Sequence, residues 1–298
     1  MYELKNKRLT LQFLTKGGAL SSIKDTEGTE YLWQGDPEYW SGQAPLLFPI
    51  CGSIRNDKAV LADGRILSMP RHGIVRKKEF EYQTGDAATA TFVVASDEET
   101  KKQYPFEFSL KVSYILKENR IEVVYEIENR DTCEMPFTIG GHPGFNCPLF
   151  PGESFSDYEV RFDQEETCTV PGQLTETGLL DTQNRQPMLD HVSSMKLDFA
   201  QFEKDAITFD QLQSRKVTLC HAETGRGVEL LFDQFPYLVL WTTANHGPFL
   251  AMEPWAGLST CTDEGDQFEE KRNTMKLKPG EKKQLSYQIV ILDQKSIR

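Results

Sequence analysis

The chain has 298 residues, of which 39% are hydrophobic and 26% charged, so it is long enough to bury a sizeable core. Its 33 Lys and Arg residues against 45 Asp and Glu residues give a formal net charge of −12, the wrong sign for a partner such as nucleic acid or an anionic membrane surface. The sequence has no apolar run near the roughly 20 residues that cross a bilayer, and its first residues read as a strand rather than a secretory signal. These features predict a cytoplasmic protein.

Strand patterns recur from end to end, whereas helical periodicity is scarce. The N-terminal residues alternate as in a strand, and alternation also predicts a hairpin of strands 106–114 and 121–127 with a break at 117–120. Further strands are expected at 79–82, 90–94, 217–220, 228–232, 237–241, 250–253 and 284–292. Proline and glycine stand at strand ends rather than in one linker. We therefore expect one all-β domain over residues 1–298, a large antiparallel sandwich.

Familiar catalytic and cofactor motifs are absent from the sequence. It contains no GxSxG elbow, no phosphate-binding GxxxxGK[ST] loop, no GxGxxG fingerprint and no closely spaced histidine pair. The six cysteines are scattered without CxxC spacing, which favours free, mostly buried thiols. A metal site assembled from the distant residues His72, His142 and Glu253 remains a minor alternative.

Two charged residues adjoin apolar runs without a motif of their own. Arg55 follows the run LLFPICGSI at 46–54, and Asp205 precedes AITF at 206–209. An arginine presents a fork of donors that suits vicinal hydroxyls or a phosphate. On a surface both side chains would simply be solvated, so the pattern alone leaves both interpretations open.

Two of the five histidines lie in segments with unusual backbone composition. His72 belongs to PRHGIVR at 70–76, and His142 belongs to FTIGGHPGFNCPL at 137–149. Glycine inside a strand usually marks a bulge or the close approach of a ligand or backbone, and we interpret Gly140 and Gly141 as letting a ligand approach and fixing where His142 points. A histidine beside a glycine is more often structural than catalytic, and a structural role is favoured more strongly for His191, His221 and His246.

The segment FLAMEPWAG at 249–257 places a carboxylate in apolar surroundings. Glu253 stands at the end of the predicted strand, and Pro254 is expected to end the pairing there. A carboxylate among apolar side chains must be paired, hydrogen-bonded or protonated, so its pKa is expected to be perturbed. Trp255 is either part of the core or an aromatic surface for the C–H face of a sugar.

The four segments together resemble the aldose 1-epimerase, or galactose mutarotase-like, family, and most closely its LacX-like branch. The resemblance rests on YLWQGDPEYWSGQAPLLFPICGSIRND at 31–57, PRHGIVR at 70–76, FTIGGHPGFNCPL at 137–149 and AMEPWAG at 251–257. It covers nearly the whole chain, and the order and spacing of the blocks are more specific than any one of them. It implies the large antiparallel β-supersandwich of galactose mutarotases.

The resemblance also implies roles for individual residues. His142 resembles the general acid of the family and Glu253 its general base, while His72 and Arg55 would hold sugar oxygens. Asp205 resembles a substrate-binding aspartate, although the motif around it is weak. The family interconverts the α and β anomers of an aldohexose without a metal or organic cofactor, so none is expected here.

The stretch HGIVR resembles a pattern in the branch of the family that acts on hexose 6-phosphates, in which Arg76 would face the phosphate. Ile74 and Val75 depart from that pattern, and the acidic net charge disfavours an anionic substrate, so we favour a free aldohexose over its 6-phosphate. The sequence does not decide whether the chain forms a homodimer.

Two other functions compete with an epimerase. A non-catalytic carbohydrate-binding or sensing protein on the same fold would need Arg55, Asp205 and Trp255 but no acid–base pair. Retention of both His142 and Glu253 favours the enzyme. Glycoside hydrolysis would need two opposed carboxylates, and only Glu253 stands in a sequence context that indicates a catalytic carboxylate.

Overall fold

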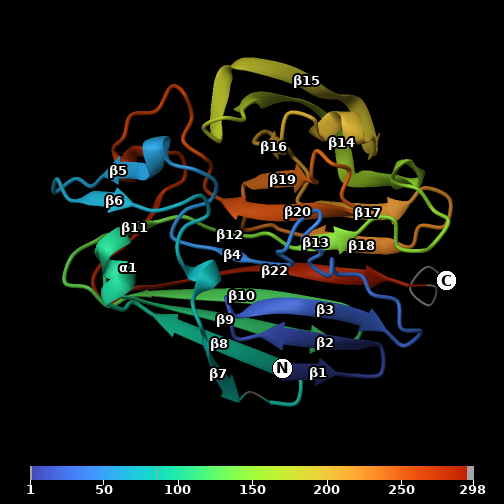
Figure 1. Ribbon diagram of the computed structural model, residues 1–298, viewed down its shortest axis with the longest axis horizontal. Helices are drawn as coiled ribbons and strands as arrows, with labels where there is room; N and C mark the ends of the chain where they lie inside the picture. Colours follow the sequence, from blue (N-terminus) through green and yellow to red (C-terminus); the bar gives the residue numbers. More distant parts are fainter. Residues whose placement is uncertain (1, 85, 294–298) are drawn as a thin grey trace.

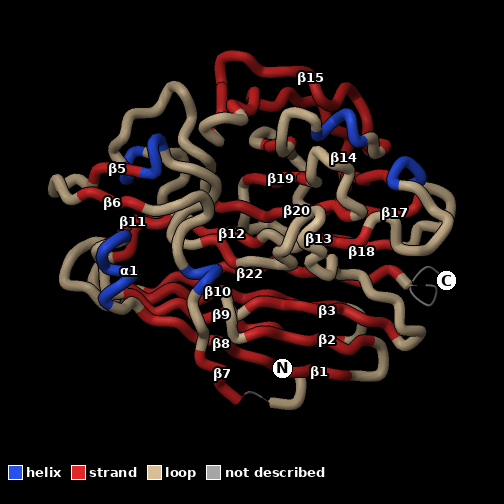
Figure 2. Tube along the Cα trace, viewed as in Figure 1, coloured by secondary structure: helices blue, strands red, loops and turns tan. Residues whose placement is uncertain are grey.

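The computed structural model describes residues 2–84 and 86–293, and the described chain is nearly all β-structure (Figure 1, Figure 2). Its largest sheet has nine antiparallel strands in the order β15-β14-β17-β18-β22-β10-β9-β8-β7. In chain order these strands are β7 (Glu81–Thr84), β8 (Thr89–Ala95), β9 (Phe108–Lys117), β10 (Arg120–Asn129), β14 (Tyr158–Leu174), β15 (Leu179–Lys196), β17 (Lys216–His221), β18 (Gly227–Leu231) and β22 (Lys282–Leu292).

A second sheet packs against the first and carries the candidate site. Its strand order is β16-β19-β20-β12-β4, and β13 also pairs with β20. All eight residues of β20 are buried, as expected for a strand covered on both faces. The strands are β4 (Leu46–Leu47), β12 (Ile139–Gly141), β13 (Gly144–Asn146), β16 (Ile207–Phe209), β19 (Tyr237–Trp241) and β20 (Phe249–Ala256).

Smaller elements complete the molecule. A three-stranded sheet packs against β7 and β8, where Tyr2 stacks on Tyr82 with ring centroids 3.9 Å apart. The helix α1 (Glu98–Gln103) begins at Asp97, whose carboxylate accepts the N–H of Thr100, an N-cap. The remaining strands are β1 (Tyr2–Lys5), β2 (Leu9–Leu14), β3 (Ala19–Asp25), β5 (Lys58–Val60), β6 (Ile66–Ser68), β11 (Met135–Phe137) and β21 (Met275–Leu277), and the short 3-10 helices are η1 (Arg55–Asp57), η2 (Val75–Lys77), η3 (Phe155–Asp157), η4 (Phe199–Phe202) and η5 (Phe268–Glu270).

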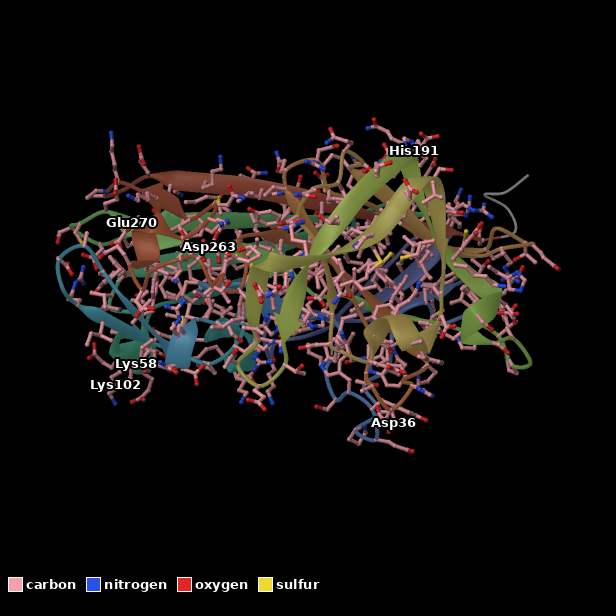
Figure 3. All side chains as sticks on the ribbon, turned by 90° about the horizontal axis from the view of Figure 1, so that it is seen from above. Asp36, Lys58, Lys102, His191, Asp263 and Glu270 are labelled. Carbon is pink, nitrogen blue, oxygen red and sulfur yellow. The ribbon has the colours of Figure 1, made fainter. Side chains whose placement is uncertain are left out.

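The predicted strands are confirmed with small shifts at their ends, but one expectation is wrong and two long strands were missed. Pro254 does not end its strand: β20 continues to Ala256, and Pro254 pairs in register with Leu238. The two longest strands, β14 and β15, were not predicted. They form a hairpin that arches over β16 and β19 (Figure 1), and Figure 3 places His191 on it, on the opposite side of that view from Asp36.

Two expectations about the chain as a whole can be compared with the structure. All six cysteines are free, and five of them are buried, which confirms the prediction of free, mostly buried thiols. Among the residues described, no helix combines the length and the apolar character that crossing a membrane requires.

Candidate active site

Strand pairing places His142 opposite Glu253. Gly140 in β12 pairs with Trp255 in β20, and Gly144 in β13 pairs with Ala251. Both pairings have the same register, and continuing it across the gap between β12 and β13 aligns residue 142 with residue 253. In that gap Met252 donates its N–H to the carbonyl of Pro143. The two segments that are distant in sequence therefore meet because the sheet aligns them.

The imidazole and the carboxylate are in direct contact. Nε2 of His142 lies 3.3 Å from Oε1 of Glu253, and both side chains are at least nine-tenths buried. Burial raises the pKa of Glu253 well above its usual value and lowers the pKa of His142 to about 3, because both charged forms lose their hydration. The pair therefore holds one proton across a wide range of pH.

A neighbouring tryptophan orients the carboxylate. The indole N–H of Trp255 donates to Oε2 of Glu253 at 3.1 Å, which leaves Oε1 for His142 and a ligand. The two residues are two positions apart on a strand and so point to the same face. Gly140 is required here, because a Cβ at that position would lie 2.9 Å from the Trp255 ring. Gly141 is required by Tyr287 of the facing sheet, whose hydroxyl would be 2.7 Å away.

This observation corrects our interpretation of the two glycines. Their missing side chains make room for protein neighbours, Trp255 and Tyr287, rather than for a ligand. They still fix the surroundings of His142, because they allow the strands and sheets around it to approach closely.

Aromatic rings enclose His142. Trp40 stacks on its imidazole with centroids 4.7 Å apart and planes 28° apart, and Trp241 meets it edge-on at 5.5 Å. Trp40 belongs to a loop that is hydrogen-bonded to the sheet, since the backbone N–H of His142 donates to the carbonyl of Pro45. An aromatic face also stabilises a nearby cation, so Trp40 favours the protonated imidazole that burial disfavours.

His72 reaches the same pocket from a strained turn. It has a φ of 68° and is followed by Gly73 at 73°, where a Cβ would lie 2.2 Å from the carbonyl oxygen of Phe48. The N–H of Gly52 donates to Nδ1 of His72 at 3.2 Å, so in the neutral ring the proton is on Nε2. Burial lowers the pKa of His72 well below its usual value. His72 is therefore a neutral donor suited to a hydroxyl or ring oxygen.

Charged groups line another part of the pocket. Nη1 of Arg71 lies 3.2 Å from Oδ2 of Asp205, and Asp205 also accepts the N–H of Ala206. Arg76 lines the same cavity, and its Nε is buried without a hydrogen-bond partner in the described part of the chain. Burial, and secondarily the charge of Arg71, lowers the pKa of Arg76. With the His142–Glu253 pair neutral overall, two arginines and one aspartate leave the pocket with an excess positive charge.

The structure brings together five of the six predicted site residues. A cavity of about 220 Å³ is lined by His72, Arg76, His142, Asp205 and Glu253. Arg55 lies elsewhere: it pairs with Asp266 at 3.2 Å and donates to the carbonyl of Glu264. Sequence reasoning missed Arg71, although it stands beside His72, and it missed Trp40 and Trp241.

The other three histidines lie outside this pocket. His191 pairs with Glu165 on the β14–β15 hairpin, His221 accepts the N–H of Glu223, and His246 stacks on Phe199. In residues 2–84 and 86–293, no group of three or more His, Cys, Asp or Glu side chains is arranged to hold a metal ion.

The antiparallel sheets and the buried pocket around His142 and Glu253 match proteins of the galactose mutarotase-like class. Solved structures support this class directly. A galactose mutarotase related enzyme from Lactobacillus acidophilus superimposes with a TM-score of 0.92 at 29% identity, covering 98% of this chain and 97% of that one. A galactose mutarotase-like protein from Lactobacillus casei gives a TM-score of 0.89 at 26% identity, covering 98% and 100%.

The chain belongs to the aldose 1-epimerase family, whose model matches residues 1–290. Among curated protein sequences it is similar to the chromosomal protein LacX of Lactococcus lactis subsp. lactis, with 47% identity over 296 residues, 98% of this chain and 99% of the relative. The resemblance noted from the sequence motifs, including the LacX-like branch and the β-supersandwich fold, is thereby confirmed.

Proposed function

We propose that the protein is an aldose 1-epimerase that interconverts the α and β anomers of an aldohexose. The observation that carries this proposal is the 3.3 Å separation of His142 Nε2 and Glu253 Oε1. Anomer exchange moves two protons on two oxygens bonded to the same carbon, the C1 hydroxyl and the ring oxygen. An acid and a base must therefore lie side by side, as these two do.

The reaction follows from the two groups. In the form of the pair in which the shared proton lies on His142, the Glu253 carboxylate takes the proton of the C1 hydroxyl, the imidazolium of His142 gives its proton to the ring oxygen, and the C1–O5 bond breaks. The aldehyde then rotates about C1–C2, and both proton transfers reverse as the ring closes on its other face. Burial raises the pKa of Glu253 and lowers that of His142. It therefore makes the carboxylate a stronger base and the imidazolium a stronger acid.

The remaining groups suit a sugar. His72 offers one donor, Arg71 and Asp205 offer charge-assisted partners for vicinal hydroxyls, and Trp40, Trp241 and Trp255 offer apolar surfaces for C–H groups. A non-catalytic carbohydrate-binding protein would use these same groups. One-dimensional exchange NMR or polarimetry on glucose, galactose and other aldoses separates the two functions, because a protein that only binds would leave every spontaneous rate unchanged.

The pH dependence of the reaction should be unusually flat. The pair is active when it holds one proton in total. As the pH falls, the pair gains a second proton only near the lowered pKa of His142, about 3. As the pH rises, it loses its remaining proton only near the raised pKa of Glu253. We expect kcat/KM, corrected for spontaneous exchange, to change little from pH 5 through pH 6.5 and to fall only above the raised pKa of Glu253, which is a broad bell. A tenfold loss per pH unit that begins at about pH 6.5 on raising the pH, where a histidine with its ordinary pKa gives up its proton, would contradict the shared proton.

A hexose 6-phosphate is a second candidate substrate, favoured by the excess positive charge of the pocket and by Nε of Arg76, which has no hydrogen-bond partner among the described residues. If the phosphate meets Arg76, Arg76→Gln should lower kcat/KM for the 6-phosphate by roughly 10- to 100-fold, since a hydrogen bond to a charged group contributes about 1.5–3 kcal/mol. The free sugar should be affected far less. Arg55→Gln is the matched control, because Arg55 lies outside the pocket. Equal losses on the two sugars would leave the free aldohexose as the substrate.

A further inference from the structure

The candidate pocket contains a cation without an anion. Arg71 forms an ion pair with Asp205, but among the described residues no carboxylate pairs with Arg76, and its Nε has no hydrogen-bond partner there. The Arg76 side chain is half-buried, and burial, followed by the like charge of Arg71, lowers its pKa. A partly desolvated guanidinium without a counter-ion is costly. A ligand that brings a negative charge would remove that cost.

The charges that line the pocket leave an excess of one positive charge. Arg71 and Arg76 are cations, Asp205 is an anion, and His142 and Glu253 share one proton and are neutral as a pair. A sugar carboxylate carries one negative charge and matches this excess. A phosphate monoester carries about −1.5 to −2 charges at pH 7 and would leave the pocket negative. A monoanionic sugar therefore fits the pocket better than a sugar phosphate.

The two members of the acid–base pair face different charged groups. Burial has the largest effect on both pKa values. The pKa of Glu253 is then lowered by the charge of Arg71 and raised by that of Asp205, whereas the pKa of His142 is lowered by the charges of Arg71 and Arg76. Arg76 therefore lies on the His142 side of the pocket. In the proposed reaction His142 protonates the ring oxygen, which is bonded to C5, so the C6 substituent on C5 is the one that approaches Arg76.

We propose that the preferred substrate is a hexuronate, an aldohexose oxidised to a carboxylate at C6, and that Arg76 binds this carboxylate. A planar guanidinium presents parallel donors that match the two oxygens of a carboxylate. The proposal rests on the proposed epimerase function, for which it names a substrate class. Its prediction for binding is separate, because the pocket requires tighter binding of a hexuronate whether or not the protein interconverts its anomers.

The test compares glucuronate and galacturonate with glucose, galactose, glucuronamide and glucose 6-phosphate, by calorimetric titration and by exchange NMR at pH 7. Glucuronamide has a planar group of the same shape at C6 but no charge, so it separates the effect of charge from that of size. We expect Kd and KM for the hexuronates to be roughly tenfold lower than for the neutral sugars and the amide, an effect of about 1.4 kcal/mol.

Variants of one helical turn locate the charge that is responsible. Arg76→Gln should remove the preference for hexuronates, because glutamine keeps hydrogen-bond donors but has no charge, and Arg76→Lys should retain part of it. Lys77→Gln is the matched control. It removes a positive charge at the next position of η2, from an exposed side chain outside the pocket, and should leave the preference intact.

Calorimetry keeps this proposal apart from the proposed function. Tighter binding of hexuronates that is lost in Arg76→Gln supports the carboxylate site, even if no sugar is interconverted above its spontaneous rate, which would overturn only the epimerase. Equal affinity of the wild type for glucuronate and glucuronamide, tighter binding of glucose 6-phosphate than of glucuronate, or a preference that survives Arg76→Gln overturns the carboxylate site.

Discussion

Glu253→Gln should lower kcat for anomer exchange by roughly 10²–10⁴-fold, the usual contribution of a general base. Glutamine keeps the volume and one acceptor oxygen for the indole N–H of Trp255, but it cannot take the proton of the C1 hydroxyl. Sugar affinity should fall much less, because His72, Arg71 and Asp205 remain in place. Exchange NMR gives the rate, and calorimetry with the same sugar gives the affinity.

The same substitution should stabilise the fold, and increasingly so as the pH rises. Burial raises the pKa of Glu253 in the folded state above the model value of 4.5. Above that value the unfolded glutamate loses its proton while the folded one keeps it, so ionisation favours the unfolded state until the pH reaches the folded pKa. Glutamine does not ionise, and the free energy of unfolding of the variant should exceed that of the wild type more at pH 8 than at pH 5. Urea denaturation at the two pH values measures this.

Glu223→Gln is the control for both measurements, since it makes the same change at an exposed carboxylate outside the pocket. It should alter neither the rate nor the pH dependence of stability. If Glu253→Gln retained near-normal exchange rates with an intact fold, the base would be elsewhere and our assignment of this site would be wrong.

Strands with a regular buried face could be predicted from the sequence, and others could not. β9 and β10 alternate buried and more exposed residues over most of their length, and the period of two is visible in the chain. β14 and β15 pair with several register shifts, and most of the central part of β15 is exposed. Bulges and a largely solvated strand erase the alternation on which such predictions depend. The β14–β15 hairpin could therefore not be predicted from the sequence.

The two residues of the proposed acid–base pair could be predicted as separate candidates, but their contact could not. Family resemblance and local composition pointed to His142 and Glu253 separately, whereas their 3.3 Å approach depends on the register of β12, β13 and β20. For Arg55 and Arg71, the local sequence did not show which arginine lies in the pocket and which lies outside it. Both follow apolar or glycine-rich segments, and only the path of each loop decides that Arg71 faces Asp205 while Arg55 pairs with Asp266.

His142→Asn should also lower kcat by roughly 10²–10⁴-fold, because asparagine remains polar but cannot protonate the ring oxygen. The double substitution with Glu253→Gln should be scarcely slower than the slower single variant. Each ring opening needs both proton transfers, so once one group is lost the other has little left to contribute. The residual rate of all three variants should reflect the binding groups alone.

His191→Asn is the matched control, since His191 is an exposed histidine on the β14–β15 hairpin, paired with Glu165, and its loss should leave the rate unchanged. If the fold-loss in the rate of the double variant equalled the product of the fold-losses of the two single variants, His142 and Glu253 would act in separate steps. Because the two side chains lie in contact and share one proton between them, the structure requires the opposite result: the loss of either partner should remove nearly all of what the pair contributes.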